Sequence, residues 1–491
     1  MGRSIIRSVL VIFSSRIGVL VLTLATTPLL VRLLGSNGYG DYSFLLSTIQ
    51  WLLVVVYVGS FDGIRKYIAE EREIDGWAGD VFGFYSKVVL GLGLVTVVAI
   101  VVIARSAFVV ESLGSDFVLY FHVVALMVVL RIPLRISRSV LLGFSLERYS
   151  EPLLIVDRLI FAAFVVLLSV VGGTVAGILG ARTVSFGIAS VFALVIVTRR
   201  VKLSKIVTHS PEYLPRKQLL GYGISTMALK FLLVSLYHTD IILLRFFVGS
   251  AETGYYRAAL VIAEFLWFVP TAIEIALPHS TSNLWVSEQY DRITAISTQT
   301  VRYTLLFTSL LVLGIAGLAR PLLSLYFGQE FAAAAGPLIV LLPGALGFAV
   351  ARPVLAITKG QSTLRGLVLV TGVAAGINGV LNLILIPRFG MAGAAIATSV
   401  GYSSMFGLHV WNARKLGIDP LADLRIKRVG VTVGVAAIPV IGLSGYITSD
   451  IIALLIVPPV GFITFGVFAL LTGAIRLDEL RRLFRNSPLV L

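Results

Sequence analysis

The sequence contains no cysteine among its 491 residues. This absence excludes disulfides, thiolate metal sites and cysteine nucleophiles. A phosphate-binding loop, a dinucleotide fingerprint, a zinc-protease motif and a serine-hydrolase elbow are also missing, so the sequence indicates no enzyme and no ATP-driven pump. The histidines lack the spacing of metal ligands: they are His122, His209, His238, His279 and His409.

Charged residues are scarce, at 13% of the chain, where a soluble domain has about 25%. Hydrophobic residues make up 57%, and the mean hydropathy is +0.97. The longest polar stretches, about 61–79, 199–217 and 280–298, are too short for a soluble catalytic domain. The composition therefore predicts a multi-pass protein of the cell membrane.

Apolar runs long enough to cross about 30 Å of hydrocarbon as a helix recur along the chain. Their length and lack of strict alternation argue against a β-barrel. The first run contains Arg16 and no clear cleavage site, so it is expected to be retained rather than removed as a signal peptide. The sequence predicts an all-α fold with fourteen spans at about 5–33, 42–60, 80–104, 117–142, 152–170, 174–198, 218–247, 256–279, 299–318, 332–357, 366–386, 390–411, 429–446 and 450–474.

The basic residues predict the orientation of these spans. With the N-terminus inside, most lysines and arginines fall in cytoplasmic segments, and fourteen spans then place both termini in the cytoplasm. The net charge of +15 is dispersed over many short inner loops, which suits anionic lipid headgroups and not nucleic acid. The predicted outer segments hold only Arg32, Arg105, Arg245, Arg257, Arg320 and Arg388.

Two sequence patterns recur at offsets of 213–217 residues, which predicts two like halves with a substrate path between them. The expected organisation is a first lobe at 1–198 with six spans, a basic cytoplasmic linker at 199–217, a second six-span lobe at 218–412, and two further spans with a tail at 413–491. The recurring residues are Arg32, Gly35, Gly38, Tyr39 and Trp51 with Arg245, Gly249, Gly254, Tyr255 and Trp267, and Arg135 and Gly143 with Arg352 and Gly360.

Basic residues within the predicted spans of the first lobe are candidates for binding an anionic substrate, because charge is costly in the membrane. Arg16 lies near mid-span, where it cannot easily reach the membrane surface. Spacings of four and three place Arg131, Arg135 and Arg138 on one helical face. Positive-inside anchoring is the alternative for these three. Arg158 and Arg182 complete the set, and for them the alternative is a structural ion pair with another helix, because the adjacent Asp157 and Arg158 point in different directions.

The second lobe carries polar residues of another kind. Lys230 and Glu264 are candidates for the substrate cavity, and the alternatives for Glu264 are a proton-coupling group or a structural ion pair with Lys230. Four residues at similar depth offer oxygen ligands that suit a small alkali cation: Asp240, Asn378, Asn382 and Thr398. The alternative is hydrogen bonding between helices without an ion.

Three motifs together resemble the polysaccharide flippases of the multidrug/oligosaccharidyl-lipid/polysaccharide exporter superfamily, over nearly the whole chain. They are Arg32-Leu-Leu-Gly35 with Gly38-Tyr39, Asp240 followed by Arg245 and Gly254-Tyr255, and Asn378-x-x-x-Asn382 with Pro387, Gly390, Gly393 and Ala397-Thr398. The resemblance implies two six-helix lobes around a central cavity, two extra helices and alternating access. Similarity to the lipid II flippases also implies a sodium site at Asp240, Asn378, Asn382 and Thr398, with one asparagine where those relatives have a carboxylate.

The function expected from the resemblance is translocation of a polyprenyl- or dolichyl-(pyro)phosphate-linked oligosaccharide, for surface polysaccharide or protein N-glycan (S-layer) assembly. No cofactor is expected; Na⁺ or H⁺ would couple transport. Expected partners are membrane lipids and the glycosyltransferases or oligosaccharyltransferase of the pathway, around a monomeric transporter. The rivals are a multidrug exporter of the same superfamily, which would need an acidic cavity, a membrane-embedded glycan polymerase and a structural scaffold.

Overall fold

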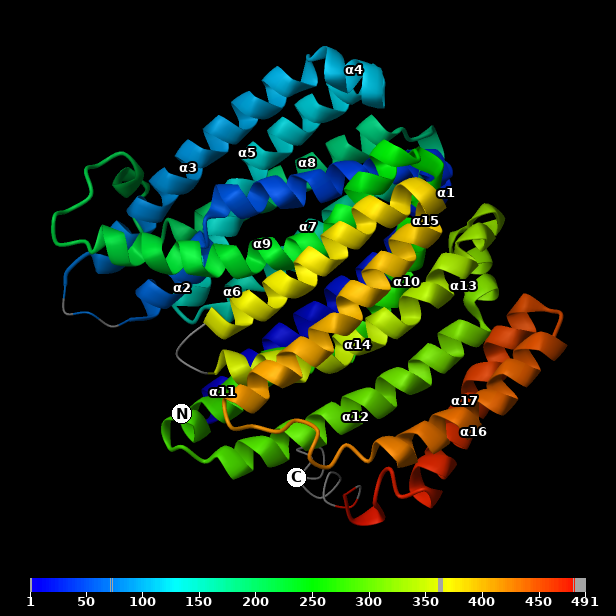
Figure 1. Cartoon of the computed structure of the whole chain (residues 1–491). Helices are drawn as coiled ribbons and strands as arrows, with labels where there is room; N and C mark the ends of the chain where they lie inside the picture. Colours follow the sequence, from blue (N-terminus) through cyan, green and yellow to red (C-terminus); the bar gives the residue numbers. More distant parts are fainter. Residues whose placement is uncertain (1, 71, 73, 361–364, 480, 482–491) are drawn as a thin grey trace. The chain divides into compact units, whose positions relative to one another are not determined.

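The computed structural model describes residues 2–70, 72, 74–360, 365–479 and 481, with side chains left undescribed at 2–13 and at 276, 279 and 280. All regular elements in this part of the chain are helices (Figure 1). Twelve of them are long and apolar enough to span a membrane. The protein is therefore an all-helical, multi-pass membrane protein, as the hydropathy predicts.

The chain order of the helices can be followed by colour in Figure 1. They are α1 (Gly2–Tyr57), α2 (Ser60–Ala69), α3 (Trp77–Ala104), α4 (Ala107–Leu113), α5 (Asp116–Gly143), α6 (Glu147–Ser150), α7 (Pro152–Val171), α8 (Val175–Val197), η1 (Leu203–Ile206), α9 (Arg216–Phe247), α10 (Ser250–Glu264), η2 (Phe265–Trp267), α11 (Phe268–Val286), α12 (Tyr290–Gly317), α13 (Ala319–Phe327), η3 (Gln329–Ala334), α14 (Ala335–Lys359), α15 (Arg365–Lys415), α16 (Ile426–Tyr446) and α17 (Asp450–Leu471).

Two of the twelve candidate spans are far longer than a bilayer requires, and each is broken by a glycine. The α1 span covers 44 residues and α15 covers 51. Gly35 in α1 has φ 64° and Gly390 in α15 has φ 55°, values that L-residues rarely adopt. The predicted first and second runs lie on the two sides of Gly35, and the predicted eleventh and twelfth lie on the two sides of Gly390.

The repeated glycines have repeated structural roles. Gly249, the counterpart of Gly35, also has a positive φ, at 126°, and it separates α9 from α10. Gly143 and Gly360 both lie at closely packed helix ends, where a Cβ would come within 2.8 Å of Ile68 and 2.9 Å of Trp285, respectively. The sequence echoes therefore mark helix breaks and close contacts.

The chain forms two compact units, residues 1–254 and 255–491. The α9 helix belongs to the first unit because it packs against α1 and α2. Within that unit, the backbones of α1 and α10 are in close contact. A Cβ atom added to Gly40 would lie 1.8 Å from the carbonyl oxygen of Ser250, and a Cβ atom added to Gly254 would lie 2.0 Å from the carbonyl oxygen of Ser36. Glycine is needed for this approach.

The basic segment at 199–217 packs against α3 within unit 1. Its η1 turn lies against Gly83, where a Cβ would be 2.4 Å from the Lys205 carbonyl oxygen. Asp80 forms an ion pair with Lys205 at 2.7 Å and accepts a hydrogen bond from the Tyr213 hydroxyl. This hydrogen bond to a carboxylate raises the pKa of Tyr213 to about 12. The expected linker is thus attached to the first unit along its length.

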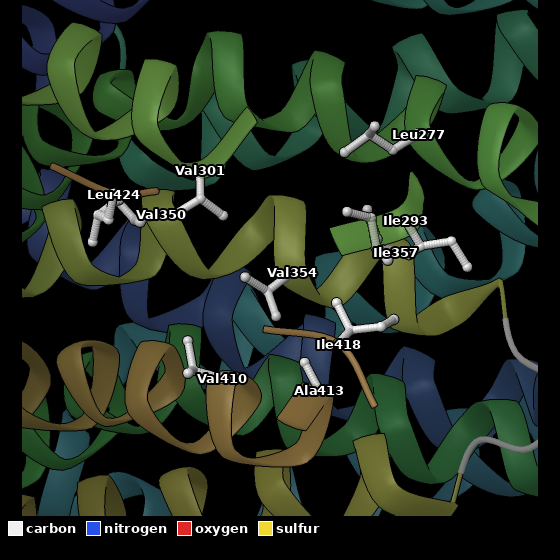
Figure 2. Close-up of a cluster of buried hydrophobic side chains, with 11 residues drawn as sticks. Leu277, Ile293, Val301, Val350, Val354, Ile357, Val410, Ala413, Ile418 and Leu424 are labelled. Atoms are coloured by element: carbon white, nitrogen blue, oxygen red, sulfur yellow. The ribbon is translucent and has the colours of Figure 1, made fainter. Parts of the chain in front are cut away.

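Unit 2 is built on the contact between α14 and α15, which small residues make close. A Cβ on Gly344 would lie 2.3 Å from the Ser399 Cα, and one on Gly347 would lie 2.8 Å from the Ser403 Cα. A cluster of buried aliphatic side chains from α11, α12, α14, α15 and residues 418–424 lies beside this contact (Figure 2). It includes Leu277, Val301, Val354, Val410 and Ile418.

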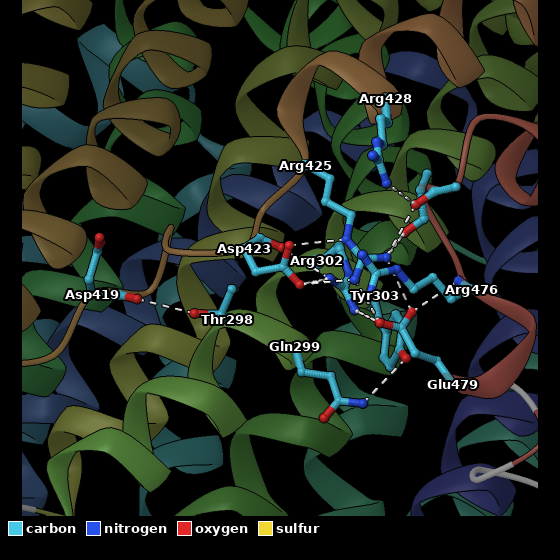
Figure 3. A network of polar contacts seen from close by, with 12 residues as sticks. Thr298, Gln299, Arg302, Tyr303, Asp419, Asp423, Arg425, Arg428, Arg476 and Glu479 are labelled. Carbon is cyan, nitrogen blue, oxygen red and sulfur yellow. Dashed lines mark hydrogen bonds and ion pairs between the residues drawn. The ribbon is translucent and has the colours of Figure 1, made fainter.

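An ion-pair network in unit 2 connects α12 to the segments before α16 and after α17 (Figure 3). Arg302 is 3% exposed at its side chain and pairs with Asp423 and with Glu479, the latter at 2.7 Å. Arg425 also pairs with both carboxylates, at 3.0 and 2.8 Å. The final helical pair, α16 and α17, is therefore fastened to α12 by charge as well as by packing.

We expect this network to make stability depend on pH only in the acid range. Burial raises the pKa of Asp423 and of Glu479, but hydrogen bonds donated to them outweigh burial, and both pKa values are lowered. Their contribution is therefore complete above the unfolded values of about 4 and is lost as the pH falls through the lower folded values. Glu479→Gln should lower the Tm by a few degrees at pH 7 because it deprives two buried arginines of a partner.

Thermal unfolding of the detergent-solubilised protein between about pH 3 and pH 8 measures this effect. Wild type and Glu479→Gln should converge toward the acid end. Arg414→Gln is the matched control, because Arg414 pairs outside the network and is 54% exposed at its side chain. A Tm difference for Glu479→Gln that stays constant down to pH 3 would contradict the expectation.

Candidate functional site

Some of the predicted basic residues of unit 1 are neutralised by carboxylates. Arg182 forms two hydrogen bonds of 3.0 Å with Asp157, and Ser185 donates to the same carboxylate at 3.0 Å. Arg138 pairs with Glu151 at 3.0 Å. The structural ion pair with another helix that was considered for Arg182 is therefore present, with Asp157 as the partner. For Arg138 the alternative considered was positive-inside anchoring, and its pair with Glu151 was not expected from the sequence.

The remaining predicted arginines have no carboxylate partner in the described part of unit 1. Arg16 is exposed on α1 and forms no hydrogen bond or ion pair with a described residue. The same holds for Arg158, which is half-buried on α7. Arg131 reaches only the neutral Gln50, at 3.4 Å, and Arg135 lies 4.1 Å from the centroid of the Phe61 ring.

Aromatic rings fix the direction of several of these guanidinium groups. The ring of Phe186 lies between two of them, 4.1 Å from Arg182 and 5.1 Å from Arg131. The charges of Arg131, Arg182 and Asp157 all act on Arg158. The helices α5, α7 and α8 thus bring three guanidinium groups around one carboxylate, and this cluster carries a net positive charge.

Arg16 forms the other part of the site. Its charge acts on Arg138, whose own charge is balanced by Glu151. An exposed guanidinium without a carboxylate partner retains all five N–H donors for a ligand. Guanidinium groups bind phosphate through paired, charge-assisted hydrogen bonds, so this set of arginines is suited to a phosphate or pyrophosphate.

Lys230 and Glu264 each have an ion-pair partner within their own unit. Lys230 pairs with Asp62 of α2. Glu264 pairs at 3.0 Å with Arg257, which lies about two helical turns earlier on α10. Each residue therefore has an ion-pair partner other than the one considered from the sequence, which was a pair between Lys230 and Glu264. Their role toward a substrate stays a prediction.

The four predicted cation ligands divide between the units. Asp240 is fully buried in unit 1 on α9, where the amide of Ile241 donates to its carboxylate at 2.8 Å. Asn378, Asn382 and Thr398 are all buried on α15 in unit 2. The two halves of α15 bring Asn378 and Thr398 together, at 3.4 Å between amide nitrogen and hydroxyl.

The buried oxygens of unit 2 suit a small cation in part. The side-chain oxygens of Asn378 and Asn382 accept no hydrogen bond from described residues, and the whole Asn382 amide is unpartnered. Such oxygens are what a hard cation prefers. The Thr398 hydroxyl already accepts from Asn378 and from Tyr256, the latter at 3.1 Å, so the asparagines are the better ligands.

Sequence reasoning did not single out one group of unit 2. Glu274 of α11 bridges Arg352, at 2.7 Å, and Lys359, at 2.6 Å, both from α14. His409 of α15 lies fully buried within reach of their charges. The sequence repeat contained a clue to this group. Arg352 is the counterpart of Arg135, but residues 57–61, which correspond to Glu274, contain no acid, so the second copy of the repeat has an acid that the first copy lacks.

Comparison with known proteins gives the following relatives. The family described as "Polysaccharide biosynthesis protein" matches residues 5–273. The "Probable low-salt glycan biosynthesis flippase Agl15" of Haloferax volcanii is 23% identical over 384 residues, which is 77% of each chain. The "Uncharacterized membrane protein MJ1068" of Methanocaldococcus jannaschii is 25% identical over 264 residues, 52% of this chain and half of that relative's length.

Solved structures share the fold. The lipid II flippase MurJ in an inward closed conformation matches with a TM-score of 0.73 and 14% identity, over 94% of this chain and 98% of MurJ. An inward-facing multidrug resistance MATE transporter of the MOP superfamily matches with a TM-score of 0.63 and 14% identity, over 81% and 94%. Both a flippase and a drug transporter therefore use this arrangement of helices, and the fold alone does not select between them.

Proposed function

Because the chain belongs to the polysaccharide biosynthesis protein family, we propose that it is a flippase for a lipid-linked oligosaccharide. Its substrate is a polyprenyl- or dolichyl-(pyro)phosphate glycan that moves from the cytoplasmic to the outer leaflet by alternating access. The observation that carries this proposal is the set of arginines without carboxylate partners in unit 1: Arg16, Arg131, Arg135 and Arg158. The kinship with Agl15, named as a probable glycan biosynthesis flippase, supports the same substrate class.

The physical problem for such a protein is the anionic headgroup, since a phosphate cannot cross hydrocarbon unaided. The unpaired arginines hold the phosphate, and the Phe186 ring, which Arg182 also contacts, keeps Arg131 in place. The lipid tail stays in the bilayer, and the uncharged sugars pass through a water-filled path. No covalent bond is made or broken, so the protein acts as a transporter and not as an enzyme.

The proposed topology has fourteen spans, with α1 and α15 each crossing the membrane twice, and both termini in the cytoplasm. Gly35 and Gly390 then lie at the two reversals on the outer side. The glycan joins surface polysaccharide or protein N-glycans, after glycosyltransferases have built it and before an oligosaccharyltransferase or polymerase consumes it. The transporter works as a monomer.

A multidrug exporter with this fold is the alternative. Exporters of lipophilic cations need acidic cavities, and the excess of guanidinium over carboxylate groups in unit 1 opposes that substrate. Deleting the gene and identifying the lipid-linked glycan left facing the cytoplasm tests the proposal. An unchanged distribution of every lipid-linked glycan, together with new sensitivity to cationic drugs, would instead identify an exporter.

Asp240 is expected to couple a cation to transport. Na⁺ would be held by Asp240, Asn378, Asn382 and Thr398 and would supply a positive charge at these oxygens. Asp240→Asn keeps the shape of the side chain but removes its charge, so it should weaken the cation dependence of flipping about tenfold or more. Flipping by proteoliposomes in a sodium titration measures this, with the exposed Asp291→Asn on α12 as the control. An unchanged cation dependence in Asp240→Asn would remove Asp240 from the coupling site.

A further inference from the structure

His409 is a buried titratable group that the proposed transport of glycans does not use. It is fully buried on α15, and neither ring nitrogen has a hydrogen-bond partner in the described part of the chain. Its neighbours Val410 and Ala413 belong to the aliphatic cluster of Figure 2. A neutral imidazole has one N–H donor and one acceptor, and leaving them buried without partners costs folding free energy.

The charged groups that act on His409 come from two neighbouring helices: Glu274 on α11 and Lys359 on α14. The Glu274 carboxylate bonds Lys359 through one oxygen and Arg352 through the other. On α15 itself, the following charged residues are Arg414 and Lys415, which face Asp419 and the Trp411 ring. The buried group therefore contains one carboxylate, two cations and one imidazole.

The two cations of this group are held differently. Arg352 is 12% exposed at its side chain and lies over the rings of Phe348 and Trp267, at 4.7 and 5.1 Å. Lys359 is 29% exposed, is the last residue of α14 and carries its ammonium on a flexible chain, which the ion pair with Glu274 holds in place. Lys359 is consequently the cation that can withdraw into water, which would leave one Glu274 oxygen without a partner.

We propose that His409 binds a proton when Lys359 withdraws from Glu274, so that a buried imidazolium replaces the Lys359 ammonium beside the carboxylate. The lone pair of the imidazole takes the proton from a hydronium ion and leaves a water molecule. The exchange keeps one carboxylate and two cations in the group, so it avoids the cost of adding a buried charge.

This exchange would make the end of α14 respond to protons. Lys359 is the last residue of α14, so its withdrawal from Glu274 removes an ion pair that holds this end of the helix to α11 when a proton enters. The use of this step in glycan transport rests on the proposed function, whereas proton binding at His409 does not. Protons and a cation at the asparagines would then act at different places on α15.

The test is a titration of the histidine resonances in the full-length, isotope-labelled protein in detergent or nanodiscs. The chain has 5 histidines, and His409→Gln identifies the signal of His409 by its loss. Lys359→Gln removes the competing cation and should tighten proton binding at least about tenfold, which moves the midpoint by about one pH unit. Glu274→Gln should weaken proton binding by a similar factor, and Arg414→Gln on the same helix should change nothing.

A His409 signal that does not titrate between about pH 4 and pH 9 would overturn the proposal. An equal titration midpoint of His409 in wild type and Lys359→Gln would also overturn the proposal. Lys359→Gln changes a partly exposed side chain, so this comparison holds even if Glu274→Gln fails to fold. Glycan flipping in proteoliposomes is measured separately. Normal titration without flipping in the wild type would count against the flippase and leave the proton site intact.

Discussion

Arg16→Ala is expected to abolish glycan export, or to reduce flipping in proteoliposomes about ten- to a hundredfold, while the protein still inserts and folds. The guanidinium is exposed and has no hydrogen bond or ion pair with described residues, so its removal leaves no buried partner unsatisfied. One charge-assisted contact to a phosphate contributes about 1.5–3 kcal/mol, which corresponds to that range. Transport should therefore fall without a matching loss of thermal stability.

The matched controls separate phosphate binding from a general effect of charge. Arg105→Ala removes another exposed arginine, at the end of α3, which is not among the proposed phosphate ligands, and should leave flipping unchanged. Arg16→Lys keeps the charge but not the paired donors, so it should restore only part of the rate. Normal flipping in Arg16→Ala would show that Arg16 does not bind the phosphate.

The helical membrane fold is predictable from the sequence because each span must satisfy its backbone hydrogen bonds internally. Hydropathy therefore locates the helices, and the repeated Arg–Gly–Tyr pattern locates the break at Gly249 and the one at Gly35. The internal packing of the 199–217 segment was not predictable. It depends on Asp80 of α3 meeting Lys205 and Tyr213, which follow it by 125 and 133 residues.

The candidate site was predictable as a set of residues but not as a set of pairs. Arg158 follows Asp157 directly, yet Asp157 bonds Arg182 on another helix, because adjacent residues of a helix point in different directions. Helix rotation decides such pairings, and a single sequence does not specify it. The distinction between paired and unpaired arginines, on which the proposed function depends, therefore required the structure.

The Arg182–Asp157 pair carries the other large expected effect, on stability. Asp157→Ala should destabilise the protein by about 3–5 kcal/mol, because Arg182 would keep its charge in a buried position without its two hydrogen bonds. The same pair holds Arg182 against Phe186, and hence Arg131, so flipping should fall as well. Denaturant or thermal unfolding in detergent measures the first effect.

A double variant distinguishes the ion pair from simple loss of packing at position 157. Asp157→Asn with Arg182→Met removes both charges and keeps the side-chain volumes similar, so it should recover most of the stability lost in Asp157→Ala. It should not recover transport, because the cluster around Arg158 then lacks Arg182 and its stacking on Phe186. If the double variant were as unstable as Asp157→Ala, packing rather than the unpaired charge would be the cause. Recovery of stability without recovery of transport would instead show that the Arg182–Asp157 pair positions the arginines that bind the phosphate.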